Sequence, residues 1–378
     1  MRDAVSPRAL GVTIAVCCYN SAERLPETLG HLLKQQVGPE IHWEVLAIDN
    51  GSTDETAQVA RRCWPTEAPT LLRIVREETV GLSRARKRAF IEAAHEIVCF
   101  VDDDNWLCPE WVSIVSRVMS DHPDVAVCGG ASVAVFEEDP PEWFERFARS
   151  YAVGSQGTER GYHLHGFWGA GLTVRKSAWD QLQKGGFEQL LPDRVGGNLS
   201  SGGDTELCMA LMRLGWKEWY EPDLTLQHYI PRDRPCWEDL RQLHRGFGAA
   251  SVVLAAYSNP PHDLKTRLSE SWLWHLQAAG RRFFSYRRKF WRALQSPMES
   301  DPEVIELEHA FGTVVELSRH WRDWSRVVRR VHDALDAAAT LQSRIAPKEM
   351  KKPLSPWRRA DAAAVASHAR SFRRGRLR

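Results

Sequence analysis

A run of three carboxylates, Asp102-Asp103-Asp104, comes directly after the apolar segment Glu96–Val101 and is followed by Asn105. Adjacent carboxylates repel one another, and a bound cation relieves that repulsion. Oxygen ligands without a neighbouring His or Cys favour Mg²⁺ or Mn²⁺, held through one or two carboxylates together with substrate phosphates. The alternative is a solvated acidic turn before the helix that begins at Pro109. The position of the run after a buried strand favours the metal.

Two further acidic clusters have the same kind of position. Asp49-Asn50-Gly51-Ser52-Thr53-Asp54 ends the apolar run Trp43–Asp49. There Asp49 can accept a hydrogen bond from the N–H edge of uracil or guanine, whereas Asp54 is typical of a helix start. In Gly203-Asp204-Thr205-Glu206, Asp204 is a candidate general base, although acids are common in the first turn of any helix.

The elements that must position these clusters alternate along the first half of the chain. Apolar, β-branched stretches predict strands at Val12–Cys18, Trp43–Asp49, Leu71–Val75, Glu96–Val101 and Val125–Cys128, and helical periodicity predicts helices at Ala22–Gln35, Glu55–Arg62, Ser83–His95, Pro109–Ser120 and Ser201–Gly215. This alternation predicts an α/β fold with a mostly parallel sheet flanked by helices. Ligands bind beyond the carboxyl ends of such strands, so the polar residues at the strand ends, Tyr19-Asn20, Asp49-Asn50 and Asp102–Asn105, should converge there. The absence of G-x-G-x-x-G after the first strand and of a Walker A lysine argues against dinucleotide and P-loop folds.

The second half has a different pattern. Loops with Gly and aromatic residues are expected from 135 to 198, and helices at Trp237–Tyr257, Leu264–Leu294 and Pro302–Ser343. We therefore expect a catalytic domain over residues 1–235, a mainly helical basic region over 236–345, and a flexible basic tail over 346–378.

The net charge of +1 is the sum of two parts of the chain that have opposite net charges. Residues 1–235 carry 24 basic and 34 acidic side chains, a net charge of −10, whereas residues 236–378 carry 26 and 15, a net charge of +11. The segment Arg281–Arg292 has six cationic and five aromatic residues, and with Trp272 and Trp274 it is suited to an anionic membrane surface. The alternative is a helix packed on the catalytic domain through its aromatic residues. Nucleic-acid binding is not expected, and pairing of the two halves between protomers leaves a homo-oligomer open.

Taken in order, five elements resemble the family-two glycosyltransferases of GT-A fold: Cys18-Tyr19-Asn20, Asp49–Thr56, Gly81–Arg86, Asp102–Pro109 and Gly203–Leu207. The resemblance covers about residues 10–235. It implies that a sugar moves from a nucleoside diphosphate donor to an acceptor hydroxyl by single displacement with inversion. It also implies a divalent metal, Mn²⁺ or Mg²⁺, on the donor diphosphate.

The resemblance also implies roles for individual residues. The nucleotide would be bound by Cys17, Tyr19, Asp49, Asn50 and Asp103, with Arg84 and Lys87 at its charged rim. Asp102 and Asp104 would hold the metal, and Asp204 would be the catalytic base. Gly203 stands where many relatives have Glu, so Glu206 is kept as a rival base. Gln242–Gly246 lacks the Trp of the Gln-x-x-Arg-Trp motif of processive synthases, which disfavours a processive polymerase.

Five other residues are candidates for substrate contacts. His228 is a candidate metal or phosphate ligand, with Arg232 and Arg234 nearby to bind phosphate. Trp168, followed by Gly169, can stack on a donor or acceptor sugar. The alternatives are a structural histidine and a core tryptophan.

The expected protein is thus a cytoplasmic glycosyltransferase that docks peripherally on the inner membrane face, since no signal peptide or long apolar run is visible. We expect a UDP-sugar donor and a glycan or lipid-linked acceptor. Eight cysteines without a C-x-x-C pair indicate reduced thiols. A sugar-nucleotide pyrophosphorylase would need a Gly-rich basic loop after the first strand, which Cys17–Asn20 does not provide. A non-catalytic membrane or nucleic-acid adaptor is disfavoured by the intact acidic clusters.

Overall fold

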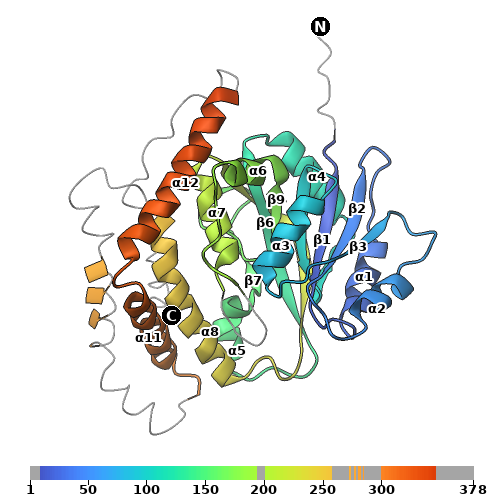
Figure 1. Cartoon of the computed structure of the whole chain (residues 1–378). Coiled ribbons are helices and arrows are strands. Elements are labelled where there is room, and N and C mark those ends of the chain that lie inside the picture. The colour runs from blue at the N-terminus through green and yellow to red at the C-terminus, as the bar shows by residue number, and fades with distance from the viewer. Residues whose placement is uncertain are drawn as a thin grey trace.

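The computed structural model describes residues 9–193, 201–257 and 299–345, together with residues 272, 273, 276, 277, 280, 281 and 284. A central sheet is flanked by helices on both faces, and further helices follow it in the chain (Figure 1). The expected α/β fold class is confirmed. Most of Arg281–Arg292, Trp274 and the tail over 346–378 lie outside the described residues, so the predictions made for them stay predictions.

The sheet is parallel in its amino-terminal part and mixed in its centre. Its strands are β1 (Val12–Cys18), β2 (Trp43–Asp49), β3 (Leu72–Arg76), β4 (Ile97–Asp102), β5 (Asn105–Leu107), β6 (Val125–Phe136), β7 (Gly154–Ser155), β8 (Gly161–His163), β9 (Thr173–Arg175) and β10 (Lys217–Ile230). They lie in the order β3-β2-β1-β4-β9-β6-β10-β5, with β7 beside β6 and β8 beside β10. Strands β1 to β4 pair in parallel, as do β6 and β10, whereas β9 runs antiparallel between β4 and β6.

The helices agree with the expected segments to within a few residues at most ends. They are α1 (Leu25–Leu33), α2 (Thr56–Cys63), α3 (Leu82–Glu92), α4 (Trp111–Asp121), α5 (Phe144–Phe147), η1 (Ala148–Tyr151), α6 (Lys176–Lys184), α7 (Gly203–Arg213), α8 (Trp237–Leu254), η2 (Ala255–Tyr257), α11 (Pro302–Arg319) and α12 (Trp324–Ile345). The helical segment expected over Pro302–Ser343 is two helices. They are separated at His320, whose ring contacts Glu316 and Asp323.

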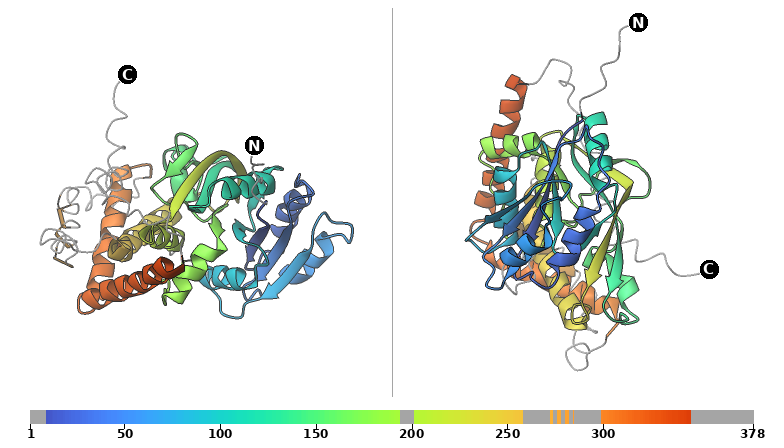
Figure 2. Two further views of the ribbon diagram at one scale, coloured as in Figure 1. Left: turned by 90° about the horizontal axis from the view of Figure 1, so that it is seen from above. Right: turned by 90° about the vertical axis from the view of Figure 1, so that its right-hand side faces the viewer.

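The sheet and the carboxyl-terminal helices share one core. Alternate residues of β1 belong to two buried clusters on opposite faces of the sheet, which explains its uninterrupted apolar sequence. The cluster on the face of α3, α6 and α7 also contains Tyr257, Trp324 and Leu335. Figure 2 shows α11 and α12 at the end of the molecule opposite β2 and β3. The helices after residue 236 therefore complete one hydrophobic layer of the sheet domain.

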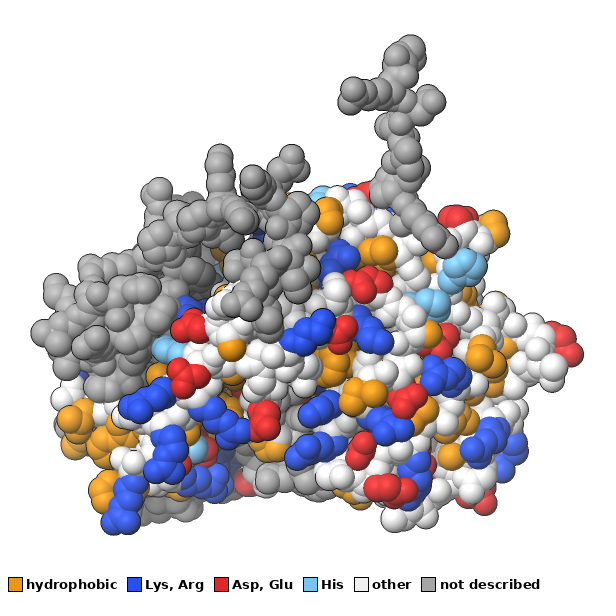
Figure 3. All heavy atoms as spheres, turned by 45° about the horizontal axis from the view of Figure 1, so that its top comes forward, with side chains coloured by type: hydrophobic (Ala, Val, Ile, Leu, Met, Phe, Trp, Pro, Cys, Tyr) orange, Lys and Arg blue, Asp and Glu red, His pale blue; other side chains and the backbone are white. Residues whose placement is uncertain are grey.

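Helices α8 and α11 cross at two glycines. A Cβ atom on Gly248 would lie 1.9 Å from the carbonyl oxygen of His309, and one on Gly312 would lie 1.9 Å from that of Arg245. Beside this crossing the buried carboxylate of Glu308 accepts hydrogen bonds from Arg241 and Arg245. Part of the positive charge of the second half is thus paired within it, and Figure 3 shows acidic and basic side chains interspersed over the described part of one face.

Among the described residues, none of the helices combines the length and the apolar character needed to cross a bilayer.

Candidate active site

The strand register brings two of the three acidic clusters together. Cys18 at the end of β1 lies opposite Asp49 at the end of β2, and Cys17 lies opposite Asp102 at the end of β4. The carboxyl ends of three adjacent parallel strands therefore present their polar residues at one edge, as the sequence predicted.

A cleft of about 450 Å³ opens beside this edge. Its walls come from β4, β10, α3, α7, η1, α8 and the loop before β9. Six of the residues singled out in the sequence line it: Asp102, Asp104, Trp168, Gly169, Asp204 and His228. The third acidic cluster, at the start of α7, thus reaches the same space as the run after β4.

The turn after β4 holds its carboxylates in a defined arrangement. The side chain of Asn105 is fully buried; its Nδ2 donates to Asp104 Oδ1 at 2.9 Å, and its Oδ1 accepts from the backbone N–H of Asp102 at 3.2 Å. Pairing of β5 with β10 places His228 opposite Asn105, and His228 Nε2 lies 3.7 Å from Asp104 Oδ1. His228 lies near the carboxyl end of β10.

These three side chains offer a limited set of metal donors. Over residues 9–193, 201–257 and 299–345, no group of three or more His, Cys, Asp or Glu side chains is close enough to enclose a metal ion. Two carboxylates with an adjacent imidazole fit Mg²⁺ or Mn²⁺, which commonly keep several waters and bind substrate phosphate. The arrangement therefore suits a metal that is completed by a diphosphate, not a closed structural site.

Asp204 and Glu206 have different surroundings. Asp204 lines the cleft, and its Oδ1 accepts a hydrogen bond from the backbone N–H of Thr205 at 2.7 Å. Glu206 is fully buried and lies outside the cleft lining. Its two oxygens accept from the N–H groups of Leu190 and Leu191, each at 2.8 Å, and it also accepts from the Tyr257 hydroxyl. Burial raises the pKa of Glu206 to about 7, against the lowering effect of these donors. The expectation of Glu206 as a rival base is corrected, because this carboxylate ties the loop before residue 193 to α7.

Arg86 is the cation of α3 that reaches the cleft. Arg84 and Lys87 are exposed and lie outside its lining, so their expected place at the rim of a nucleotide pocket stays a prediction. Arg86 is buried, and its Nη1 lies 3.1 Å from Asp193 Oδ2. Burial lowers the pKa of Arg86, but the nearby carboxylates, Asp193 above all, raise it above its usual value.

Two features keep Arg86 in place. Asp193 Oδ1 also accepts the N–H of Gly203 at 2.6 Å, which joins the arginine to the first residue of α7. A Cβ atom at Gly169 would lie 2.0 Å from Arg86 Nη2, so only glycine leaves room for the guanidinium. The helical spacing of the buried positions Ala85, Arg86, Ala89 and Phe90 was the signal that distinguishes Arg86 from its neighbours.

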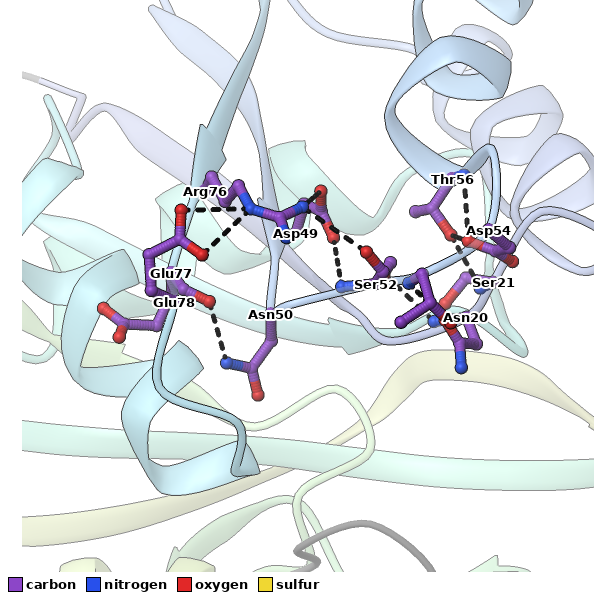
Figure 4. Close-up of polar contacts among 11 residues, drawn as sticks. Asn20, Ser21, Asp49, Asn50, Ser52, Asp54, Thr56, Arg76, Glu77 and Glu78 are labelled. Carbon is purple, nitrogen blue, oxygen red and sulfur yellow. Dashed lines mark hydrogen bonds and ion pairs between the residues drawn. The ribbon is translucent and has the colours of Figure 1, made fainter.

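The side chains of the cluster after β2 form hydrogen bonds within their own loop and to neighbouring segments (Figure 4). Asp49 accepts hydrogen bonds from the N–H of Ser52 and from Arg76 Nη1, both at 3.0 Å. Asn50 Oδ1 accepts from the N–H of Gly81 at 2.7 Å, and its Nδ2 donates to the carbonyl of Thr79 at 2.7 Å. Asn50 thus anchors the loop that leads into α3.

Asn20 and Asp54 extend the same network. Asn20 Oδ1 accepts from the N–H of Thr53 at 2.8 Å, and Asp54 accepts from the N–H groups of Ala22 and Thr56, both at 3.0 Å. Asp54 therefore has the structural role expected from its position before a helix.

The remaining predicted residues lie apart from the cleft lining. Cys17 is buried beneath the strand ends, and burial raises the pKa of its thiol to about 12, whereas the Tyr19 ring is exposed. Asp103 is buried and pairs with Arg24 at 2.7 Å. Arg232 is exposed, with Nη1 3.6 Å from a Glu138 oxygen, and neither Arg232 nor Arg234 lines the cleft. Their expected phosphate contacts have no support from this geometry.

With the site described, comparisons with known proteins identify its class. Residues 13–182 match the family model described as glycosyl transferase family 2. Among curated proteins, the chain is 24% identical over 140 residues to the putative glycosyltransferase EpsH of Bacillus subtilis, covering 37% of this chain and 39% of that protein. It is 30% identical over 101 residues to the glycosyltransferase AglE of Haloferax volcanii, covering 27% and 33%.

Solved structures are similar at lower identity. The S. aureus TarS 1–349 structure is 17% identical, with a TM-score of 0.46 over 89% of this chain and 91% of that one. The mannosyltransferase PcManGT from Pyrobaculum calidifontis, solved in complex with GDP-Man and Mn²⁺, is 18% identical, with a TM-score of 0.45 over 96% and 80%.

Residues 13–182, a little under half of this chain, are similar to glycosyl transferase family 2. The match spans 39% of the EpsH length and 33% of the AglE length.

Proposed function

We propose that this protein transfers a sugar from a nucleoside diphosphate donor to a hydroxyl group of a glycan or lipid-linked acceptor, with inversion at the anomeric carbon. The observation that carries the proposal is that Asp102, Asp104 and His228 line the same cleft as Asp204, within and beside a glycosyl transferase family 2 domain. One wall can hold the leaving diphosphate, and the other can accept the proton of the attacking hydroxyl.

On the donor side, Asp102 and Asp104 would hold Mn²⁺ or Mg²⁺ against the diphosphate, with His228 beside them. When bound, the metal supplies Lewis-acid neutralisation of the charge that develops on the leaving group. Arg86 adds a buried positive charge to the same region. The nucleoside would extend over the ends of β1 and β2. There Asp49 uses one lone pair on each oxygen, so its carboxylate retains capacity to bind the N–H edge of a base such as uracil.

On the acceptor side, Asp204 would take the proton as the hydroxyl attacks. A positioned general base of this kind contributes about 10²–10⁴-fold to rate. Attack from the side of α7, opposite the departing diphosphate, gives inversion. Glu206 cannot share this task, because its oxygens are directed to Leu190, Leu191 and Tyr257.

The donor assignment is tested by calorimetry with UDP, GDP and CDP, each with and without Mn²⁺. We expect one nucleotide to bind more tightly with the metal, and we expect the metal-dependent part of that affinity to disappear in Asp104→Asn. Asp121→Asn, at the exposed end of α4, is the matched control and should bind like the wild type. If no nucleotide gains affinity from Mn²⁺ or Mg²⁺, the proposed function is wrong.

We also propose that the protein docks peripherally on anionic membranes through Arg281–Arg292. This proposal rests on the composition of that segment alone. Flotation with anionic and neutral liposomes tests it: binding to the anionic vesicles should fall as salt rises, and equal recovery with both vesicle types would contradict it.

A further inference from the structure

One wall of the cleft carries hydrogen-bond donors that the proposed reaction does not use. This wall is formed by η1, the loop around Trp168 and the apolar face of α8. The guanidinium carbon of Arg149 lies 5.2 Å from the centre of the Trp168 ring, within the range of a cation–π contact. The arginine is thereby oriented over an aromatic surface inside the cleft.

Arg149 has donor capacity to spare. A guanidinium has five N–H groups, and the structure gives Arg149 one hydrogen bond, from Nη1 to the carbonyl of Ser155 at 2.6 Å. No carboxylate lies within ion-pair distance of Arg149 among the described residues, and burial lowers its pKa without an opposing acidic group. Arg86 in the same cleft is paired with Asp193.

Two buried polar atoms on this wall also lack partners. Within the described part of the chain, neither the indole Nε1 of Trp168 nor the hydroxyl of Tyr151 has a hydrogen-bond partner. Tyr151 is only 3% exposed. Buried donors are normally satisfied by protein, water or ligand, so donors without partners on the wall that carries Arg149 point to a ligand that accepts hydrogen bonds.

The position of this wall indicates which of the two substrates, acceptor or donor, it would contact. Arg149 and Tyr151 belong to η1, which continues from α5, and Phe147 and Tyr151 pack in a cluster with Trp237 of α8. These elements cover the β6 and β10 half of the sheet, whereas the nucleoside is expected over β1 and β2. The wall therefore belongs to the side from which the acceptor would approach.

We propose that this wall is a subsite for an anionic group of the acceptor, a carboxylate or a phosphate, and that Arg149 is the residue that selects it. The inference rests on the proposed function and names its acceptor class. The anion would receive charge-assisted hydrogen bonds from Arg149, with Trp168 and Tyr151 available to complete them.

The test compares three probes that share a sugar ring and an aglycone: p-nitrophenyl β-glucoside, its 6-phosphate, and p-nitrophenyl β-glucuronide. Binding of each is measured by calorimetry in the presence of UDP and Mn²⁺. We expect at least one charged probe to bind about tenfold or more tightly than the glucoside, because hydrogen bonds to charged groups are among the stronger ones. Which charged probe is preferred separates carboxylate from phosphate as the source of the anion.

Variants assign that preference to its residue. Arg149→Gln should remove the preference while nucleotide binding persists, and Arg149→Lys should keep part of it. Arg146→Gln, an exposed arginine of α5 outside the cleft, is the matched control and should leave the preference unchanged.

Three results would overturn the inference. They are the absence of a charge preference in the wild type, a preference that survives Arg149→Gln, and a loss of UDP affinity in Arg149→Gln equal to the loss of probe affinity. The last result would assign Arg149 to the donor diphosphate. Probe binding needs no turnover and is repeated without UDP and Mn²⁺, so a protein that fails to bind any nucleotide still tests this subsite separately from the proposed function.

Discussion

Two polar groups at the same edge of the sheet differ in what their side chains bind. In the loop after β2, Asp49, Asn50 and Asp54 direct their oxygens to backbone N–H groups of neighbouring loops. Around the turn after β4, Asp102, Asp104 and Asp204 line an open cleft. In the amino-acid sequence the two groups have similar acidic motifs. The comparison teaches that the first group is held mainly by contacts within the protein, although Asp49 keeps capacity for the proposed nucleobase contact, and that the second group faces the cleft.

This difference has an energetic basis. A buried polar side chain with satisfied hydrogen bonds rigidifies its surroundings, and its removal leaves several backbone groups without partners. A carboxylate that lines a cleft can be neutralised at little cost to folding, but the chemistry that depends on its charge is then lost. Substitutions in the two groups should therefore separate activity from stability.

The largest effect is expected for Asp204→Asn. Transfer should slow by about 10²–10⁴-fold, because the amide cannot accept the acceptor proton. Thermal unfolding and nucleotide affinity should stay close to the wild type. Steady-state kinetics and calorimetry on the same preparation check both statements. Full turnover in this variant would show that Asp204 of α7 is not the catalytic base.

A change in the supporting group should have the opposite signature. Asn50→Ala removes the hydrogen bonds to Gly81, Thr79 and Glu77. We expect the free energy of unfolding to fall by about 2–3 kcal/mol, since each lost bond leaves a backbone partner unsatisfied. Urea denaturation measures this loss. Glu55→Gln, an exposed change nearby, serves as the control and should shift stability by no more than about 0.5 kcal/mol.

Glu206→Gln tests the difference between Asp204 and Glu206 within α7. At about pH 8 the wild-type carboxylate accepts from Leu190, Leu191 and Tyr257, whereas an amide offers a single acceptor oxygen. The free energy of unfolding should fall by about 1–3 kcal/mol. Glu188→Gln removes an exposed ion pair with Arg330 and should have little effect. A variant that kept its stability but lost turnover would restore Glu206 as a catalytic group.

A pH dependence of stability is expected from His244 in α8. Burial lowers the pKa of His244 from 6.5 to about 4, and its Nε2 lies 2.9 Å from Ser150 Oγ. The unfolded state binds more protons between these values, so stability should be complete above about pH 6.5 and should fall as the pH approaches 4. His244→Gln should flatten this part of the curve. Equal slopes for the two proteins in urea titrations would show that other groups produce it.

The sequence predicted the strands and their common edge because apolar, β-branched segments buried on both faces have few alternatives. It did not distinguish among Arg84, Arg86 and Lys87, three cations on one helix, because the choice depends on which face of α3 covers the sheet. Asp204 and Glu206 differ by about 200° around α7, so one faces the cleft and the other the core. Only tertiary packing decides which. Arg149 carried no local signal, because its proposed role depends on the absence of an acidic partner for it among the described residues.

The contact between Gly203 and Asp193 has a consequence for how this site can change in evolution. A Cβ atom at residue 203 would lie 2.3 Å from Asp193 Oδ2 and 2.2 Å from Gln189 Nε2. The family resemblance implies Glu at this position in many relatives, whereas in this chain Asp193 of the loop supplies the carboxylate beside Arg86. The two solutions compete for one volume beside Arg86. Moving from one to the other therefore requires paired substitutions at 193 and 203, and each single intermediate would be either overcrowded or short of a partner for the arginine.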